Sequence, residues 1–156
     1  KNLKKLGFDK IILSGYSAGG WSSLFLQSRF PEKIIGTIAF NPAFAGPKRE
    51  WQKKYPEWGA FREDSVNKFN KANTINAIIF AHKDDIFEDP KTLSFFENFK
   101  NLSLIDYSEL KPTKCNWADV NEKMTADKGH NIPQSKCFTK YLEDKNYLIS
   151  FLENII

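Results

Sequence analysis

A serine lies within the pattern G-x-S-x-G, which spans residues 15–19 and closely follows the apolar run at residues 11–13. This pattern is typical of a serine on a strained strand-to-helix turn, with its hydroxyl exposed above a parallel sheet. Glycines are expected two residues either side of the serine because strand and helix cross closely there. Ser17 is therefore a candidate nucleophile. The alternatives are an ordinary serine in a glycine-rich turn and an anion site at a helix N-terminus.

An acidic residue and then a histidine follow along the chain, in the order that this pattern requires of a catalytic triad. Asp84 and Asp85 come after the apolar run Ala77–Ala81, and His130 comes later. Histidine suits the role of general base because its ordinary pKa of about 6.5 leaves it mostly neutral near pH 7. The alternative for His130 is a solvated loop histidine beside a turn glycine. The other histidine, His82, is expected to be structural, packing at the strand end or shaping the acid loop.

With these residues the chain resembles the C-terminal part of an α/β-hydrolase, of the esterase or dienelactone-hydrolase-like kind. The matching segments form the serine turn, the acid loop and the histidine loop, at residues 15–20, 81–85 and 129–130. The order of the elements between them agrees with the family over nearly the whole chain. In that family the acid lies three residues after a glycine that closes the strand. His82 stands where that glycine would be, which favours Asp85 over Asp84 as the acid.

The resemblance implies nucleophilic acyl transfer without a cofactor. Ser17 would attack a carbonyl carbon, His130 would take its proton, and Asp85 would orient the imidazole and stabilise the imidazolium. The backbone N–H of Ala18 would be one oxyanion donor, and the second comes from a loop after an earlier strand. We expect that loop and the N-terminal strands to lie outside this chain, as in a C-terminal fragment of the fold. That expectation leaves the activity of the isolated chain open.

Strand patterns alternate with helical patterns along the chain. Strands are expected over residues 10–14, 34–40, 76–81 and 102–107, and helices over about 18–29 and from 135 or 138 to the end. The pair Asp89-Pro90 is expected to begin a further helix that buries Leu93, Phe96 and Phe99. This alternation predicts an α/β fold, a three-layer α/β/α arrangement with a mostly parallel sheet, as one domain over residues 1–156. The candidate catalytic residues then follow carboxyl ends of strands, where open α/β sheets bind ligands.

The segment 41–73 has the least regular pattern and holds several aromatic residues among prolines and charges. In the resembling family an insertion at this place commonly forms a small cap over the site. Trp51 and Trp58 are therefore candidates for lining a pocket for a small acyl substrate, and Tyr16, next to Ser17 in the turn, is a further candidate. The alternative is that the aromatics of this segment pack it onto the edge of the sheet.

Cys115 and Cys137 are the only cysteines and lie on either side of His130. A disulfide between them would close the histidine loop and, in the chain-entropy model, stabilise the fold by about 3 kcal/mol. It would also indicate export to an oxidising compartment. The alternative is two free thiols in a cytoplasmic protein. No spacing of cysteines or histidines is typical of a metal site.

The charge and the apolar content of the chain limit the classes of partner that it is expected to bind. The formal net charge is +4, and the lysines are scattered or mixed with acids, which is typical of solvated faces rather than of a nucleic-acid or membrane surface. No apolar run reaches the length of about 18 residues that a membrane span needs. Three classes remain: an esterase-like serine hydrolase, an acyltransferase or peptidase on the same triad, and a non-catalytic binding protein of this fold. The oligomeric state and the substrate's identity stay open.

Overall fold

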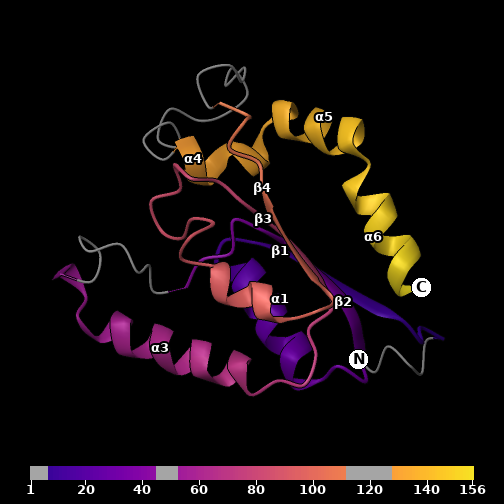
Figure 1. Cartoon of the computed structure of the whole chain (residues 1–156), viewed down its shortest axis with the longest axis horizontal. Helices are drawn as coiled ribbons and strands as arrows, with labels where there is room; N and C mark the ends of the chain where they lie inside the picture. The colour runs from indigo at the N-terminus through magenta and orange to yellow at the C-terminus, as the bar shows by residue number, and fades with distance from the viewer. Residues whose placement is uncertain (1–6, 45–52, 112–127) are drawn as a thin grey trace.

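The computed structural model describes residues 7–44, 53–111 and 128–156. Its centre is a four-stranded parallel sheet in the order β1-β2-β3-β4 (Figure 1). The strands are β1 Ile11–Tyr16, β2 Ile34–Phe40, β3 Ala77–Ala81 and β4 Leu102–Asp106. Each strand lies within two residues of its expected bounds. The predicted α/β class with a parallel sheet is confirmed.

Helices cover both faces of this sheet (Figure 1). One face carries α1 (Ala18–Arg29), α3 (Glu57–Asn70) and the short 3-10 helix η2 (Ser94–Asn98). The opposite face carries α5 (Lys136–Lys145) and α6 (Tyr147–Ile155). Two single-turn helices, α4 (Lys128–Asn131) and η5 (Ile132–Gln134), lead into α5. The described elements therefore form the expected three layers.

Strand β3 is buried along its whole length, and its side chains alternate between two apolar clusters. Ile79 packs in the cluster under α1 and α3, which includes Trp21 and Phe69. Phe80 packs in the opposite cluster with residues of the C-terminal helices. Burial on both faces is typical of an inner strand of a parallel sheet. The acid loop that follows β3 therefore starts from the most buried strand of the described sheet.

The C-terminal segment forms two helices, whereas its sequence predicted one. Helix α5 begins within the expected bounds, and Ser135 caps it: its side chain accepts a hydrogen bond from the Phe138 amide at 3.2 Å. The break comes at Asn146, which has φ 53° and lies in the left-handed region. Asparagine tolerates this conformation better than most residues, and it commonly ends helices. The apolar spacing continues through the break and so concealed it.

The helix predicted after Asp89 consists of a single turn and the 3-10 helix η2, with Leu93 and Phe96 buried as predicted and Phe99 half-buried. The Asp89 carboxylate accepts from the Thr92 amide, and the Thr92 hydroxyl accepts from the Asp89 amide, each at 2.8 Å. This reciprocal pair closes a single turn, which is followed by η2. Leu93, Phe96 and Phe99 are spaced by three residues, which is the period of a 3-10 helix rather than the 3.6 of an α-helix.

Helix α3 lies in the segment that sequence patterning left irregular. Its inward face carries the polar residues Arg62 and Ser65 beside Phe69. The Trp21 indole N–H donates to the Ser65 hydroxyl at 2.9 Å, which satisfies both buried groups. A hydropathy pattern cannot identify a buried face that contains an arginine and a serine. No helix in the three described segments is long and apolar enough to cross a membrane.

Candidate active site

Ser17 occupies the turn between β1 and α1, with φ 55° and ψ −127°. A positive φ is costly for a residue with a side chain and persists only where its surroundings enforce it. Here the Ser17 amide donates to the Phe40 carbonyl at 3.0 Å. The Ser17 carbonyl accepts from the amides of Trp21 and Ala43, each at 3.1 Å. The end of β2 and the start of α1 therefore hold the turn in its strained form.

The glycines of the turn do not share one role. A Cβ on Gly15 would lie 2.4 Å from the carbonyl carbon of Gly19, and one on Gly20 would lie 2.9 Å from the Gly15 carbonyl oxygen. A Cβ on Gly19 would meet nothing within 4 Å. The expectation of a close crossing is thus right for Gly15 and wrong for Gly19. The tight contact joins β1 to the first turn of α1.

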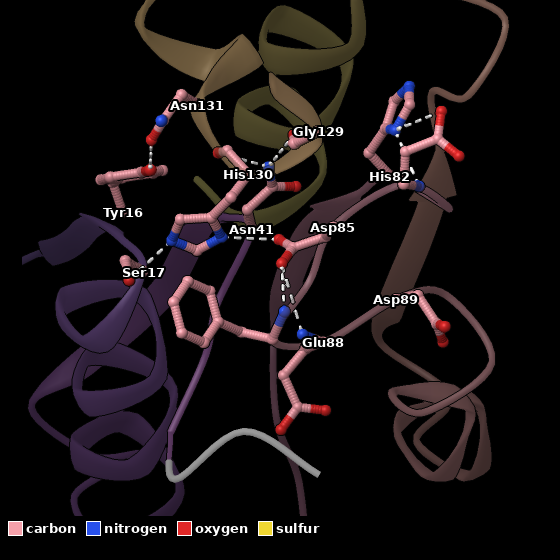
Figure 2. A network of polar contacts seen from close by, with 12 residues as sticks. Tyr16, Ser17, Asn41, His82, Asp85, Glu88, Asp89, Gly129, His130 and Asn131 are labelled. Atoms are coloured by element: carbon pink, nitrogen blue, oxygen red, sulfur yellow. Dashed lines mark hydrogen bonds and ion pairs between the residues drawn. The ribbon is translucent and has the colours of Figure 1, made fainter. Parts of the chain in front are cut away.

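Three side chains from distant parts of the sequence meet beside this turn (Figure 2). The His130 Nδ1 lies 2.7 Å from the Asp85 carboxylate, and its Nε2 lies 2.9 Å from the Ser17 hydroxyl. The Asp85 side chain is fully buried and that of His130 is 6% exposed. A carboxylate can only accept, so Nδ1 carries the proton and Nε2 accepts from the Ser17 hydroxyl. The arrangement is a continuous hydrogen-bond chain from a buried carboxylate to a serine on a strained turn.

Asp85 and its neighbour Asp84 lie in different surroundings. One Asp85 oxygen faces His130, and the other accepts from the amides of Phe87 and Glu88 at 2.8 and 3.4 Å. The Asp84 side chain is 56% exposed and lies beside His82. Only Asp85 can therefore orient the His130 imidazole.

The ring of His130 lies between two aromatic rings. The Tyr16 ring centroid is 5.0 Å from the imidazole centroid, and the Phe87 centroid is 4.7 Å away, edge to face. The Tyr16 hydroxyl donates to the side-chain carbonyl of Asn131 at 2.7 Å (Figure 2). These contacts restrict the imidazole to the plane that joins Asp85 to Ser17.

The histidine loop packs directly on the acid loop at Gly129. A Cβ at this position would lie 2.1 Å from the Asp84 carbonyl oxygen, closer than any side chain allows. Glycine at residue 129 therefore lets the backbone of α4 approach the acid loop, which brings His130 within reach of Asp85.

A cavity of about 360 Å³ opens at the serine. Its lining combines the turn with apolar residues from α3 and from the loops after β2 and β3: Ser17, Ala18, Ala43, Phe44, Trp58, Phe61 and Phe87. The Ala18 amide is the first of α1, where the helix dipole favours negative charge. An apolar chamber with a nucleophile and an amide donor at one end suits the acyl part of a carbonyl compound.

The pocket candidates from the sequence have different outcomes. Trp58 lines the cavity, whereas Tyr16 is absent from its lining and lies against His130 instead. Trp51 lies outside the described residues. Sequence reasoning missed Phe44 and Phe87, which carry no pattern of their own. It also overlooked Asn41, although a polar residue at the carboxyl end of a strand is a recognisable signal.

His82 has the structural environment that the sequence predicted. It is fully buried, its Nε2 donates to the Leu110 carbonyl at 3.2 Å, and its Nδ1 accepts from the Asp84 amide at 3.1 Å. Burial lowers the pKa of His82 below 6.5, and the Leu110 carbonyl acts in the opposite direction. The neutral ring thus ties the acid loop to the segment after β4.

Within the described residues, no group of three His, Cys, Asp or Glu side chains could hold a metal ion. Cys137 lies in the first turn of α5, but Cys115 lies outside the described residues. The disulfide between them therefore stays a prediction.

Comparison with known proteins finds similar structures but no similar sequences. No protein-family model matches the chain. No curated protein sequence matches it either. The structure is similar to a Bacillus subtilis protein that is named a hydrolase, with 14% identity and a TM-score of 0.55, over 96% of this chain and 62% of the other. It is also similar to the enol-lactonase from Burkholderia xenovorans, with 14% identity and a TM-score of 0.50, over 97% of this chain and 68% of the enol-lactonase.

A monoacylglycerol lipase from Paleococcus ferrophilus matches with 17% identity and a TM-score of 0.47, over 67% of this chain and 60% of the lipase. The chain thus spans about three fifths of the length of solved structures that it matches. At these identities the likeness shows the fold alone. With its parallel sheet, two helical layers and serine turn, the chain is part of an α/β-hydrolase fold.

Proposed function

We propose that this chain carries the catalytic triad of a serine hydrolase that cleaves a carboxylic ester or a similar small acyl compound. The observation that carries the proposal is the hydrogen-bond chain from Asp85 through His130 to Ser17, with distances of 2.7 and 2.9 Å. A merely structural serine has no need of positive φ, a buried imidazole and a buried carboxylate together.

In the proposed reaction, the Ser17 hydroxyl attacks the carbonyl carbon while His130 Nε2 takes its proton. The negative charge that develops on the carbonyl oxygen is stabilised by the Ala18 amide at the start of α1. The tetrahedral intermediate collapses, and His130 gives the proton to the leaving oxygen. A water molecule, deprotonated by His130, then attacks the acyl carbonyl carbon; the bond to the Ser17 oxygen breaks, and His130 returns the proton to Ser17 as the acid leaves. Asp85 keeps the imidazole in the required tautomer throughout.

The cavity at Ser17 supports an apolar acyl group of modest size. Its volume is about 360 Å³, near the lower end of ligand pockets. Trp58 and Phe61 of α3 form part of its wall, which supports the proposal that the segment 41–73 acts as a small cap.

Labelling of the full-length protein with a fluorophosphonate probe tests the nucleophile. We expect Ser17 to be labelled, and Ser17→Ala to abolish both labelling and hydrolysis of p-nitrophenyl butyrate. Ser22→Ala is the matched control, because Ser22 is exposed on α1 one turn beyond the serine, and it should label like the wild type. Mass spectrometry of the labelled peptide identifies the residue. Equal labelling of the Ser17→Ala variant would contradict the proposal, and a wild type that resists the probe would favour a binding protein.

Truncation of Trp58 tests the acyl site. Trp58→Ala enlarges the cavity, so we expect the preferred p-nitrophenyl ester to shift to a longer acyl chain. Each additional buried methylene contributes about 0.8 kcal/mol, roughly fourfold in kcat/KM. Phe30→Ala is the control, since Phe30 is an exposed aromatic residue at the far end of α1. An unchanged chain-length preference in Trp58→Ala would argue against this cavity as the acyl site.

A further inference from the structure

Asn41 is a buried polar residue at the carboxyl end of β2, and the proposed triad does not use it. It is 1% exposed and has φ 41°, in the left-handed region. Its backbone amide donates to the Phe80 carbonyl at 2.8 Å, which fixes it to the neighbouring strand β3. A buried residue held in a strained conformation commonly marks a functional position.

The side chain of Asn41 reaches across to the histidine loop (Figure 2). Its Nδ2 donates to the carbonyl of His130 at 2.8 Å and to that of Gly129 at 3.0 Å. Its Oδ1 accepts from the Tyr107 hydroxyl at 2.8 Å. The two loop carbonyls can only accept, so they fix the amide with its NH₂ group toward the loop, and the Tyr107 hydroxyl then donates to Oδ1.

Phe40, the residue before Asn41, binds the serine turn. The Phe40 carbonyl accepts the hydrogen bond from the Ser17 amide at 3.0 Å. Adjacent residues at the end of β2 thus bind the serine turn through a backbone carbonyl and the histidine loop through a side chain. The distance between Ser17 and His130 is consequently set by one short piece of rigid strand.

The histidine loop needs such an anchor. Helix α4 has only four residues, so its carbonyls cannot all be satisfied by hydrogen bonds within the helix. Tyr16 binds the side chain of Asn131 and Asp85 binds the imidazole, whereas the side chain of Asn41 binds the backbone carbonyl of His130 itself.

We propose that Asn41 is a positioning residue that keeps His130 in register with Ser17 by binding the backbone of the histidine loop. The inference rests on the proposed serine hydrolase function for its effect on rate, but its geometric part can be tested separately. A displacement of about 1 Å in a catalytic group can lower the rate about 100-fold. The amide binds the backbone of His130, and Asn41 is not one of the residues that line the cavity at Ser17.

Removing the amide should lower kcat with little change in KM. We expect kcat of Asn41→Ala to fall about 100-fold for p-nitrophenyl butyrate while KM stays within about threefold. Asn41→Gly, which accommodates positive φ without strain, should show the same loss. If Asn41→Ala fails to fold, judged by circular dichroism, Asn41→Gly decides the result. A folded variant of either kind with wild-type kcat would overturn the inference.

Asn41→Asp gives a pH signature that a general loss of stability would not give. The introduced carboxyl group has the shape of the amide but faces two carbonyl oxygens, so its pKa should be raised. While protonated it can still donate one hydrogen bond, and once ionised it repels both carbonyls. We therefore expect its kcat, relative to the wild type, to be highest at low pH and to fall as pH rises. A pH-independent ratio would contradict this.

Proton NMR tests the geometry without relying on hydrolysis. The chain has two histidines, so a His82→Gln background leaves His130 as the single source of imidazole resonances. We expect a low-field Nδ1–H resonance from the His130–Asp85 hydrogen bond, lost or broadened in Asn41→Gly. Asn76→Ala is the matched control: Asn76 also donates to a backbone carbonyl, that of Ile35 at 3.1 Å, but it precedes β3 at the opposite end of the sheet.

The two proposals fail in different ways. Asn76→Ala should leave both the resonance and kcat unchanged, so equal effects at Asn76 and Asn41 would reduce Asn41 to an ordinary structural residue. A wild type that shows the resonance but is not labelled by the fluorophosphonate would refute the serine hydrolase. The role of Asn41 in holding His130 would then be decided by its effect on the resonance alone.

Discussion

Asp85→Asn is expected to lower kcat by about 10⁴-fold, as the loss of the orienting acid does in serine proteases. The Asp85 carboxylate accepts the His130 Nδ1 proton at 2.7 Å, and its other oxygen is held by backbone amides. In the variant the backbone amides of Phe87 and Glu88 keep the amide oxygen, so the NH₂ group faces His130 and donates to Nδ1, and the imidazole carries its proton on Nε2. That tautomer cannot accept the proton of Ser17. Steady-state kinetics with an activated ester measures the loss.

Asp84→Asn is the matched control for this variant. Asp84 is the adjacent residue, its side chain is mostly exposed, and it makes no contact with the His130 ring in the described structure. We expect kcat within about threefold of the wild type, because removing an exposed charge beside His82 changes little. If Asp84→Asn were the damaging variant and Asp85→Asn the mild one, the acid would have to be reassigned.

The second large effect concerns the stability of the acid loop. Arg62 of α3 donates to both oxygens of Glu88, at 2.7 and 2.9 Å, and to the Thr92 carbonyl at 2.8 Å. The Glu88 side chain is fully buried and that of Arg62 is 16% exposed. Removing one partner of a buried ion pair typically costs about 3–5 kcal/mol. We therefore expect Arg62→Met to lower the free energy of unfolding by about this amount, measured by urea denaturation.

The loss of unfolding free energy in Arg62→Met should increase with pH. Burial raises the pKa of Glu88 from 4.5 to about 7, while Arg62 acts to lower it. Because the folded-state pKa is the higher one, the contribution of Glu88 to stability is full below about pH 4.5 and is lost as the pH rises through 7. Without Arg62 the pKa rises further, and ionising the carboxyl becomes costlier. The difference between wild type and Arg62→Met should be larger at about pH 8.5 than at about pH 5.5.

Two controls separate the buried pair from general effects on α3. Lys68→Met removes the exposed pair of Lys68 with Asp64 on the same helix and should change stability by less than about 0.5 kcal/mol. The double variant Arg62→Met/Glu88→Met replaces both charges by apolar side chains and should recover most of the loss. A loss below about 1 kcal/mol for Arg62→Met at both pH values would contradict the assignment.

Local sequence signals determined most of the elements that carry the candidate site. Strands β1 to β4 are short apolar runs, and helix α1 starts directly at the G-x-S-x-G turn. Both features depend on residues close together in the chain, so period and turn chemistry predict them. The order of Ser17, the acid and His130 indicated the family resemblance, and the position of His82 in the acid loop favoured Asp85.

Other features depend on contacts between distant segments, and the sequence did not predict them. Helix α3 was missed because its inward face holds Arg62 and Ser65, whose partners Glu88 and Trp21 lie elsewhere in the chain. The break at Asn146 was missed because an apolar stripe continues across it and only a single φ changes sign.

The tertiary structure alone decided how the site is held. Asn41 and Gly129 lie 88 residues apart, yet their contact anchors the histidine loop to the end of β2. Tyr16 looked like a pocket residue from its place in the turn, but packing put its ring against His130. A local pattern specifies which residue types stand at a strand end. Only the sheet order, which joins strands distant in sequence, determines which of those residues meet.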